Sequence, residues 1–452
     1  MNDITIIGGG SSGWFTAAFL SYHNPDKQIV LIEAPDIPNI GVGEGTFPTT
    51  MHLLNSIGIK PSELIAKSNA GLKIGIQYVD FAEKPFWLTV QPINEWQQFG
   101  SELINSLALL NKCPILDDSI NTFHAIHFIA DDFINLLKTY AIKYGVKHLQ
   151  NKVVDSSVHD DICSSITLDS GETIKSKWFV DCSGFLRLLI KQTSSKFISY
   201  SNELLVNSAV VGPADYVNID REFNVFTKIT AKQAGWQFRV PTYKRTGNGY
   251  VYSSDFITSK DAEKDLVSSV KLTKDPKHIK MNLGYYDKLI VGNIVAVGLS
   301  AGFIEPLEAT AIYIAERVAI GFNEILNGLK NTSSINAILS DKIQYIKTLI
   351  LAHYAFSPRS DPFWAAAREA ASSSREIKEF FNRLNNNSYP TDADVLDVAY
   401  PYCQWNDLLR GFNKPHMYPT VTHEAKKQVY LATYYLPNHY NYITSVRSSN
   451  AG

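Results

Sequence analysis

The sequence predicts a mixed α/β protein built on a Rossmann-like, doubly wound sheet, with an antiparallel sheet and a helical C-terminal region added to it. Three observations support this prediction. A strand, a glycine-rich loop and a helix follow one another at the N-terminus, β-rich segments fill the middle of the chain, and helical patterns dominate after about residue 335. The length of 452 residues predicts one composite domain or two closely packed ones.

The first 50 residues carry the parts of a dinucleotide-binding unit. A β-rich run, 3–7, enters Gly8-Gly9-Gly10-Ser11-Ser12-Gly13, a match to GxGxxG. A predicted helix, 14–22, and a second strand, 28–32, follow. In this motif the glycines admit a tight turn and a pyrophosphate, the helix N-terminus stabilises phosphate charge, and a later acidic residue binds a ribose. The predicted contacts are Gly8, Gly10, Ser11, Ser12, Gly13, Trp14 and Glu33.

A later glycine-bearing segment favours FAD over NAD as the dinucleotide. Residues 290–297 are predicted to form a strand that enters Gly298-Leu299-Ser300-Ala301-Gly302-Phe303, and a helix is expected from about Leu307. Many FAD enzymes close over the flavin ring with such a late strand, loop and helix. Residues 178–184 are typical of a further strand that meets a tight turn near the cofactor.

The rest of the chain divides by its residue pattern. Residues 1–80 and 125–190 alternate strand and helix signals, with a clear helix at 130–144, whereas the block 200–285 is rich in β signals. The sequence therefore predicts a discontinuous FAD-binding module over 1–200 and 286–335, an antiparallel substrate-side sheet over 201–285, and a helical C-terminal region over 336–452 that covers the substrate site.

Composition excludes several kinds of protein. Lys plus Arg total 42 and Asp plus Glu total 44, so the formal charge is −2 and no nucleic-acid partner is expected. The N-terminus lacks the basic start of a signal peptide, and the longest apolar stretch, 289–304, is too short to span a bilayer. We therefore expect a soluble, cytoplasmic protein without a membrane partner. The sequence leaves open whether it forms a homo-oligomer.

Neither disulfides nor a metal site are expected. His124 and His127 lack a third ligand nearby in the sequence, so we interpret them as core or surface histidines. The cysteines form no CxxC pair and are interpreted as free thiols: Cys113, Cys163, Cys182 and Cys403.

Four segments together resemble the flavin-dependent halogenases whose best-known members act on tryptophan. The glycine motif is followed by Gly41-Val42-Gly43-Glu44-Gly45-Thr46, similar to the family's GVGEAT signature, and 71–76 is similar to the KLGI segment that bears its lysine. Residues 235–241, GWQFRVP, are similar to the WxWxIP motif that distinguishes these enzymes from flavin hydroxylases. Residues 303–312, FIEPLEATAI, are similar to F-x-[DE]-P-L-E-[SA]-T-x-I. The resemblance covers residues 3 to about 365.

The resemblance implies a reaction. In the family, reduced flavin reacts with oxygen and chloride, bromide or iodide to give a hypohalous acid, which travels through a tunnel to a lysine and halogenates an electron-rich aromatic carbon. The matching lysine is Lys73, which either hydrogen-bonds the hypohalous acid or becomes a haloamine. Glu308 is the expected partner, which stabilises the cationic ring or removes its proton.

The residue pattern itself leaves two readings of each catalytic candidate open. Lys73 lies between Leu72 and Ile74, so strand alternation could point it into a cavity, where its pKa would be depressed, or towards the surface. Glu308 could be catalytic or could be a carboxylate that favours a helix N-terminus beside Pro306.

The resemblance also assigns binding positions. Thr310 and Ala311 match positions whose backbone N–H groups hold halide, as suits a helix N-terminus. A wall between the flavin and the organic substrate is expected from Trp236, Phe238 and Pro241, with Phe238 standing where the family has tryptophan. Further cofactor contacts are expected at Ala34, Ile37, Ile40, Glu44, Gly45, Val153, Leu299 and Ile312.

The expected partners are a flavin reductase and an aromatic small molecule. No second nucleotide motif for NAD(P)H follows the first, so the family's separate reductase is expected to supply FADH2. The C-terminal region diverges from the tryptophan-specific members, which predicts an open site near 86–100, Trp405 and 434–442. The alternatives are a single-component flavin monooxygenase that hydroxylates its substrate and a non-catalytic FAD-binding protein.

Overall fold

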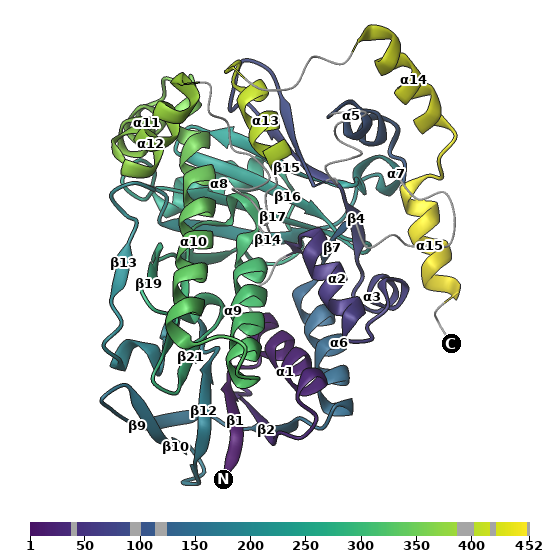
Figure 1. Cartoon of the computed structure of the whole chain (residues 1–452). Coiled ribbons are helices and arrows are strands. Elements are labelled where there is room, and N and C mark those ends of the chain that lie inside the picture. The colour runs from purple at the N-terminus through teal and green to yellow at the C-terminus, as the bar shows by residue number, and fades with distance from the viewer. Residues whose placement is uncertain (38–42, 91–100, 114–123, 387–401, 416–421, 450–452) are drawn as a thin grey trace.

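Two large sheets organise the part of the chain that the structure describes (Figure 1). The structure is a computed structural model, and it describes residues 1–37, 43–90, 101–113, 124–386, 402–415 and 422–449. The six-stranded sheet lies near the N-terminus, and the seven-stranded sheet lies at the other end of the long helix α10 (Thr332–Phe356). The mixed α/β class expected from the sequence is confirmed.

The six-stranded sheet contains the predicted dinucleotide-binding unit. Its order is β20-β21-β12-β1-β2-β8, and β1 (Asn2–Ile7) pairs in parallel with both β2 (Ile29–Glu33) and β12 (Ser176–Asp181). The last four residues of β1 are all buried, as in a parallel sheet that helices cover on both faces. Helix α1 (Ser11–His23) follows β1 directly. The predicted strand, helix and second strand are therefore confirmed to within a few residues.

Two predicted elements near residue 300 were wrong in detail. Residues 290–297 form an antiparallel hairpin, β20 (Ile290–Val291) and β21 (Ile294–Ala296), instead of one strand. The reversal occurs at Gly292, whose φ of +57° suits a tight turn, and only β21 continues alongside β12. The following helix, α9, begins at Thr310 instead of near 307, because Ala309 adopts a left-handed conformation that interrupts the helix.

The seven-stranded sheet unites the middle of the chain with an early segment. Its order is β18-β14-β17-β16-β15-β5-β6, and the pairs from β18 to β15 are antiparallel, as the β-rich middle block predicted. However, β5 (Gly75–Val79) joins β15 (Phe226–Lys232) in parallel, and β6 (Phe86–Thr89) forms the edge. The remaining strands are β14 (Ser208–Ala214), β16 (Gly235–Pro241), β17 (Thr246–Tyr252) and β18 (Lys277–Lys280).

A small sheet connects the two large ones. It consists of β3 (Glu44–Gly45), β7 (Ala125–Phe128) and β4 (Gly71–Lys73), all antiparallel. Strand β4 leads into β5 after one residue, so Lys73 lies where the small sheet meets the seven-stranded sheet. Two other three-stranded sheets consist of β9 (Val153–His159), β10 (Ile162–Leu168) and β11 (Thr173–Ile174), and of β13 (Phe197–Ser199), β19 (Gly284–Tyr286) and β22 (Gly302–Phe303).

Helices cover the sheets and dominate the described residues after 335. One continuous apolar core includes Ile4 in β1, Trp236 in β16 and Ile443 in the last helix. Within the described residues, no helix is both long and apolar enough to cross a bilayer. The other helices are α2 (Pro48–Ser56), α3 (Pro61–Lys67), α5 (Ser101–Leu110), α6 (Ala130–Lys143), α7 (Ile219–Glu222), α8 (Ser259–Ser269), α11 (Pro362–Ser373), α12 (Arg375–Asn385), α13 (Tyr402–Gly411), α14 (His423–Tyr434) and α15 (His439–Ser449), with β8 at Lys147–Gln150.

Candidate active site

The glycine loop after β1 forms a tight cradle that side chains would fill. Gly8 has a φ of +114°, and a Cβ on it would lie 2.2 Å from the Cys182 carbonyl oxygen. A Cβ on Gly13 would lie 1.9 Å from the Gly8 carbonyl oxygen, whereas a Cβ on Gly10 would meet no atom within 4 Å. The loop is therefore closed on its inner side and open at Gly10, as the backbone approach of a pyrophosphate requires.

A second loop closes on this cradle from the late hairpin. Gly298 begins the 3₁₀ turn Gly298–Ser300, and a Cβ on it would lie 2.3 Å from the Ser12 Oγ. The Ser300 hydroxyl donates to the Gly184 carbonyl at 3.3 Å. The two glycine-bearing segments and the turn after β12 therefore meet, and the half-buried Leu299 lies at their junction. The residues present fit a bound dinucleotide.

Glu33, the predicted ribose-binding residue, ends β2 beside two basic side chains. Its carboxylate is 2.8 Å from His148 Nε2 and 3.4 Å from Lys138 Nζ. Lys138 also lies 5.3 Å above the buried Trp14 ring. The Asn151 N–H donates to the Glu33 carbonyl, which places Val153 at the start of β9 close by. Ala34 is half-buried, Ile37 is exposed, and Ile40 lies outside the described residues.

Lys73 is fully buried at the end of β4. Its Nζ donates to the Thr46 carbonyl at 3.2 Å and lies 5.2 Å from the centre of the Phe47 ring. A Cβ on Gly45 would lie 3.1 Å from this Nζ, so the glycine leaves the ammonium group its space. Burial lowers the pKa of Lys73 to about 8, and the negative charge of Glu308 opposes this shift. Lys73 is therefore not a surface lysine.

Replacing Lys73 with Met is expected to stabilise the protein at neutral pH. Because the unfolded chain binds the Lys73 proton with a pKa of 10.5 and the folded protein with a pKa of about 8, the buried charge costs about 3 kcal/mol below pH 8. This cost disappears as the pH rises from 8 to 10.5, so the advantage of Lys73→Met should shrink over that interval. Urea unfolding of both proteins at pH 7 and pH 10 measures the difference. A variant that is less stable at pH 7 would contradict the prediction.

Glu308 is also buried, in the 3₁₀ turn Pro306–Glu308 that precedes α9. Its Oε1 accepts a hydrogen bond from the Tyr78 hydroxyl in β5 and lies 3.1 Å from His353 Nε2 in α10. Because Glu308 is buried and contacts two polar side chains, it is not simply an exposed carboxylate that favours a helix N-terminus. Glu308 also acts electrostatically on Lys73, so the two predicted catalytic residues are both buried and lie within electrostatic range of each other.

A second buried carboxylate anchors the predicted wall. Trp236 Nε1–H donates to the Tyr354 hydroxyl at 3.1 Å, and that hydroxyl donates to Glu305 Oε1 at 2.9 Å. Burial raises the pKa of Glu305 to about 8, so this carboxyl is mainly protonated at pH 7. The Phe238 ring lies 6.3 Å from the Trp236 ring, on the same face of β16. The hydrogen bonds fix the orientation of the Trp236 ring.

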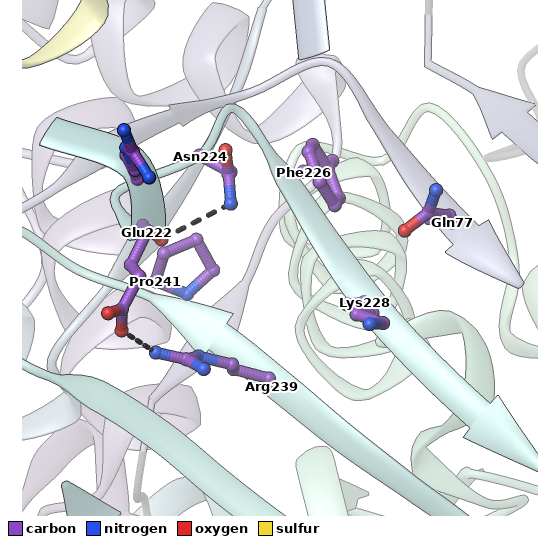
Figure 2. Close-up of a pocket in the computed structure, with 8 residues that line it drawn as sticks. Gln77, Glu222, Asn224, Phe226, Lys228, Arg239 and Pro241 are labelled. Carbon is purple, nitrogen blue, oxygen red and sulfur yellow. Dashed lines mark hydrogen bonds and ion pairs between the residues drawn. The ribbon is translucent and has the colours of Figure 1, made fainter. Parts of the chain in front are cut away.

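Pro241 lies apart from the other two wall candidates. Side chains alternate along β16, so Pro241 and Arg239 project from the face opposite Trp236 and Phe238. Pro241 lines a cleft that has a volume of about 200 Å³. Figure 2 shows Pro241 there beside Arg239, which pairs with Glu222. The cleft is lined by Gln77, Arg221, Glu222, Asn224, Phe226, Lys228, Arg239 and Pro241.

The predicted halide positions begin helix α9. Ala309 has a φ of 54° and supplies no side-chain cap, so Thr310 and Ala311 start the helix directly. Thr310 is buried and Ala311 is half-buried. Ile312 is buried one residue further on. On strand β3, burial and the negative charge of Asp131 raise the pKa of Glu44, another predicted cofactor contact, to about 7.

Several residues near the site have contacts that the sequence did not predict. Tyr78, which donates to Glu308, belongs to none of the four motifs. Glu305 stands at the [DE] position of the last motif but had no predicted role, although the Tyr354 hydroxyl links it to Trp236. His439 in α15 accepts a hydrogen bond from the Leu72 N–H at 3.1 Å, next to Lys73, across 367 residues of sequence. Trp405, expected near the substrate, is a core residue that is 2% exposed and donates to the Tyr345 hydroxyl.

The described residues contain no cluster that could bind a metal. No group of three or more His, Cys, Asp or Glu in them is arranged for coordination. His127 instead contacts the Thr227 hydroxyl at 2.8 Å inside the core. Cys113, Cys163 and Cys182 are free thiols, and the Cys403 side chain lies outside the described part.

Comparisons with known proteins agree over nearly the full length. The sequence matches the family model for tryptophan halogenases over residues 3–427. Tryptophan 6-halogenase ThaL of Streptomyces albogriseolus is 30% identical, with 90% of this chain and 86% of that protein aligned. Tryptophan 7-halogenase RebH of Lentzea aerocolonigenes is also 30% identical, over 82% of this chain and 79% of that protein.

A solved structure supports the fold independently. The tryptophan halogenase from Shewanella frigidimarina superposes with a TM-score of 0.86 and 23% identity, over 99% of this chain and 98% of that one. This identity supports the fold only, whereas the family match and the 30% identical relatives establish descent. The chain therefore belongs to the tryptophan halogenase family of flavin-dependent enzymes.

Proposed function

We propose that this chain halogenates an electron-rich aromatic carbon, using FADH2 from a separate reductase, oxygen and a halide. One observation supports the proposal: Lys73 and Glu308, from distant parts of the sequence, are both fully buried, and the carboxylate charge of Glu308 acts on the Lys73 ammonium. A buried lysine with a depressed pKa beside a carboxylate is typical of a functional site.

The bound flavin would supply hypohalous acid from oxygen and halide. Lys73 Nζ–H would donate to the hypohalous acid oxygen and so orient the halogen towards the substrate. The aromatic carbon bonds to the halogen as the oxygen–halogen bond breaks, and the departing oxygen takes a proton from Lys73 and leaves as water. Glu308 then accepts the proton of the substituted ring carbon, whose C–H electrons restore the aromatic ring.

The wall and the halide site would support this reaction. We infer that Trp236 and Phe238, which share one face of β16, separate the flavin from the organic substrate. The Pro241 ring lines the cleft on the other face of β16. Pro241 would therefore support the wall only by fixing the backbone at the end of this strand. We also infer that the backbone N–H groups of Thr310 and Ala311 bind halide, because α9 starts there without a side-chain cap.

Two glycine variants are expected to separate FAD binding from folding. In Gly10→Ala the added methyl group meets no protein atom within 4 Å, so the Tm should not change. The methyl group would instead occupy the space of the pyrophosphate and weaken FAD binding by about tenfold or more.

Gly13→Ala places a methyl group 1.9 Å from the Gly8 oxygen and should lower both Tm and FAD affinity. Flavin fluorescence titration and thermal unfolding measure these effects, and tight FAD binding by Gly10→Ala would place the cofactor elsewhere.

Halogenation itself is tested with the full chain, a generic flavin reductase, NADH, FAD and bromide. A panel of tryptophan, other indoles and phenols is read by mass spectrometry for the bromine isotope doublet. We expect a brominated product only when the reductase is present, and a mixture of equal halide concentrations would rank chloride, bromide and iodide. An oxygenated product that forms without halide, or rapid NADPH oxidation by the chain alone, would favour a single-component hydroxylase instead.

A further inference from the structure

His439 is the first residue of helix α15, and its side chain lies between two distant segments of backbone. The N–H of Leu72, the residue before Lys73, donates to His439 Nε2 at 3.1 Å. On the other side of the ring, Nδ1 lies 3.0 Å from the Phe223 carbonyl oxygen. All of these residues are fully buried, so the two backbone groups depend on a partner within the protein.

The imidazole takes the place of one hydrogen bond in a parallel strand ladder. Strand β5 pairs in parallel with β15, and just before this pairing the Ile74 N–H donates to the Val225 carbonyl at 2.8 Å. Such bonds recur at every second residue, so the preceding one would join the Leu72 N–H to the Phe223 carbonyl. His439 instead lies between these two groups and bonds to both. The ladder is therefore continued through a side chain.

The surrounding residues leave room for the ring. The His439 ring stacks on the Phe223 ring, with centroids 4.3 Å apart and an angle of 20° between the planes. A Cβ on Gly71 would lie 2.6 Å from Phe223 Cε2 and 3.3 Å from His439 Cε1, so a larger residue there would displace this pair. Strand β4 is the last strand of its small sheet, and His439 supplies the acceptor that a further strand would supply.

Helix α15 is itself held in place. The His439 N–H donates to the Asn111 carbonyl at 3.0 Å. Further along the helix, Arg447 donates to the Ile65 carbonyl of α3 at 3.2 Å, and α15 packs against α3 (Figure 1). The helix therefore brings a fixed side chain to the strand that carries Lys73.

The hydrogen-bond partners decide the form of the imidazole. A backbone N–H only donates, so Nε2 must offer its lone pair to Leu72. A carbonyl oxygen only accepts, so Nδ1 must carry the hydrogen that points to Phe223. The other tautomer and the imidazolium would both set an N–H against the Leu72 N–H. Burial, in agreement, lowers the pKa of His439 to about 4.

We propose that His439 is a positioning residue for Lys73. Its bridge between Leu72 and Phe223 fixes the end of β4, and with it the direction of the lysine side chain, whose Nζ lies 3.2 Å from the Thr46 carbonyl oxygen. A displacement of about 1 Å at a reacting group can lower a rate about 100-fold. The catalytic part of this proposal rests on the halogenation proposed above, whereas the bridge itself does not.

The bridge is tested by NMR, whether or not the protein halogenates. The full chain is labelled with ¹⁵N-histidine, and the His439 signals are those missing from His439→Gln. At pH 7 we expect Nδ1 of His439 to carry a hydrogen and Nε2 to carry none. A hydrogen on Nε2 in the wild type would overturn the proposal.

The catalytic consequence is tested by the amount of brominated product formed per flavin reoxidised. His439→Phe keeps a flat ring that can neither accept nor donate, so kcat for bromination should fall by about tenfold or more, with KM, FAD affinity and flavin reoxidation unchanged. In His439→Gln one amide can accept from the Leu72 N–H and donate to the Phe223 carbonyl, so this variant should recover part of the rate. Bromination by His439→Phe at the wild-type rate would refute the positioning role.

A matched control excludes a general loosening of α15. Thr444→Val removes a contact of 3.2 Å between α15 and the Tyr243 hydroxyl without touching β4. We expect its product yield per flavin to equal that of the wild type. A loss as large as that of His439→Phe would show that any weakening of α15 has this effect, and the specific role of His439 would fail. If the wild type brominates nothing, the proposed function fails, and the NMR result still decides whether the bridge exists.

Discussion

Lys73→Met is expected to lose halogenating activity by about 10³-fold or more while it still binds FAD. Lys73 is the only ammonium group that the sequence resemblance assigns to the site, and it is buried with its Nζ against the Thr46 carbonyl. Methionine fills a similar volume but cannot donate a hydrogen bond or carry a halogen. The substrate would then meet no oriented hypohalous acid, so little product should form.

The measurement is the rate of brominated product with reductase, FAD and bromide, together with the rate of flavin reoxidation. We expect reoxidation by oxygen to continue in Lys73→Met, because this step does not use the lysine. Lys67→Met is a suitable control, since Lys67 lies on α3 with an exposed side chain that pairs with Glu63 at 2.8 Å. Wild-type product formation by Lys73→Met would refute the proposed role of the lysine.

Glu308→Gln is expected to lower the bromination rate by about 10²-fold. Glutamine has nearly the same shape, so the contact with the Tyr78 hydroxyl can persist. However, an amide can neither accept the proton of the substituted ring nor oppose the cationic intermediate with a full charge. The loss should appear in kcat more than in KM, because these interactions arise only as the reaction proceeds.

Glu316→Gln provides a matched control for this variant. Glu316 is another fully buried glutamate, on helix α9, and burial raises its pKa to about 8. Because this carboxyl is mainly neutral at pH 7, glutamine imitates it well, and the bromination rate should not change. Equal losses in Glu308→Gln and Glu316→Gln would indicate that any change of a buried carboxyl in this region disturbs the fold, and the role of Glu308 would lose its support.

Much of the fold could be predicted from local patterns. The N-terminal strand, glycine loop and helix are coded by neighbouring residues, since the required turn and close approach are properties of glycine itself. The helix predicted at 130–144 also agrees with α6, because its apolar residues follow helical spacing. The hairpin at Gly292 was missed, since an apolar run with one glycine has the same pattern in a strand and in a tight hairpin.

The sequence by itself identified Lys73 and Glu308 as the candidate catalytic residues, because each belongs to a short motif that can be recognised from neighbouring residues alone. The tertiary structure alone decided what surrounds them. The Tyr78 hydroxyl reaches Glu308 across 230 residues of sequence, and His439 fixes the backbone beside Lys73 across 367. Such contacts depend on how distant segments pack, and no short pattern records that packing. Pro241 is a further example. It belongs to the same sequence motif as Trp236, but its ring projects from the other face of the strand, so the two cannot form one wall with their side chains.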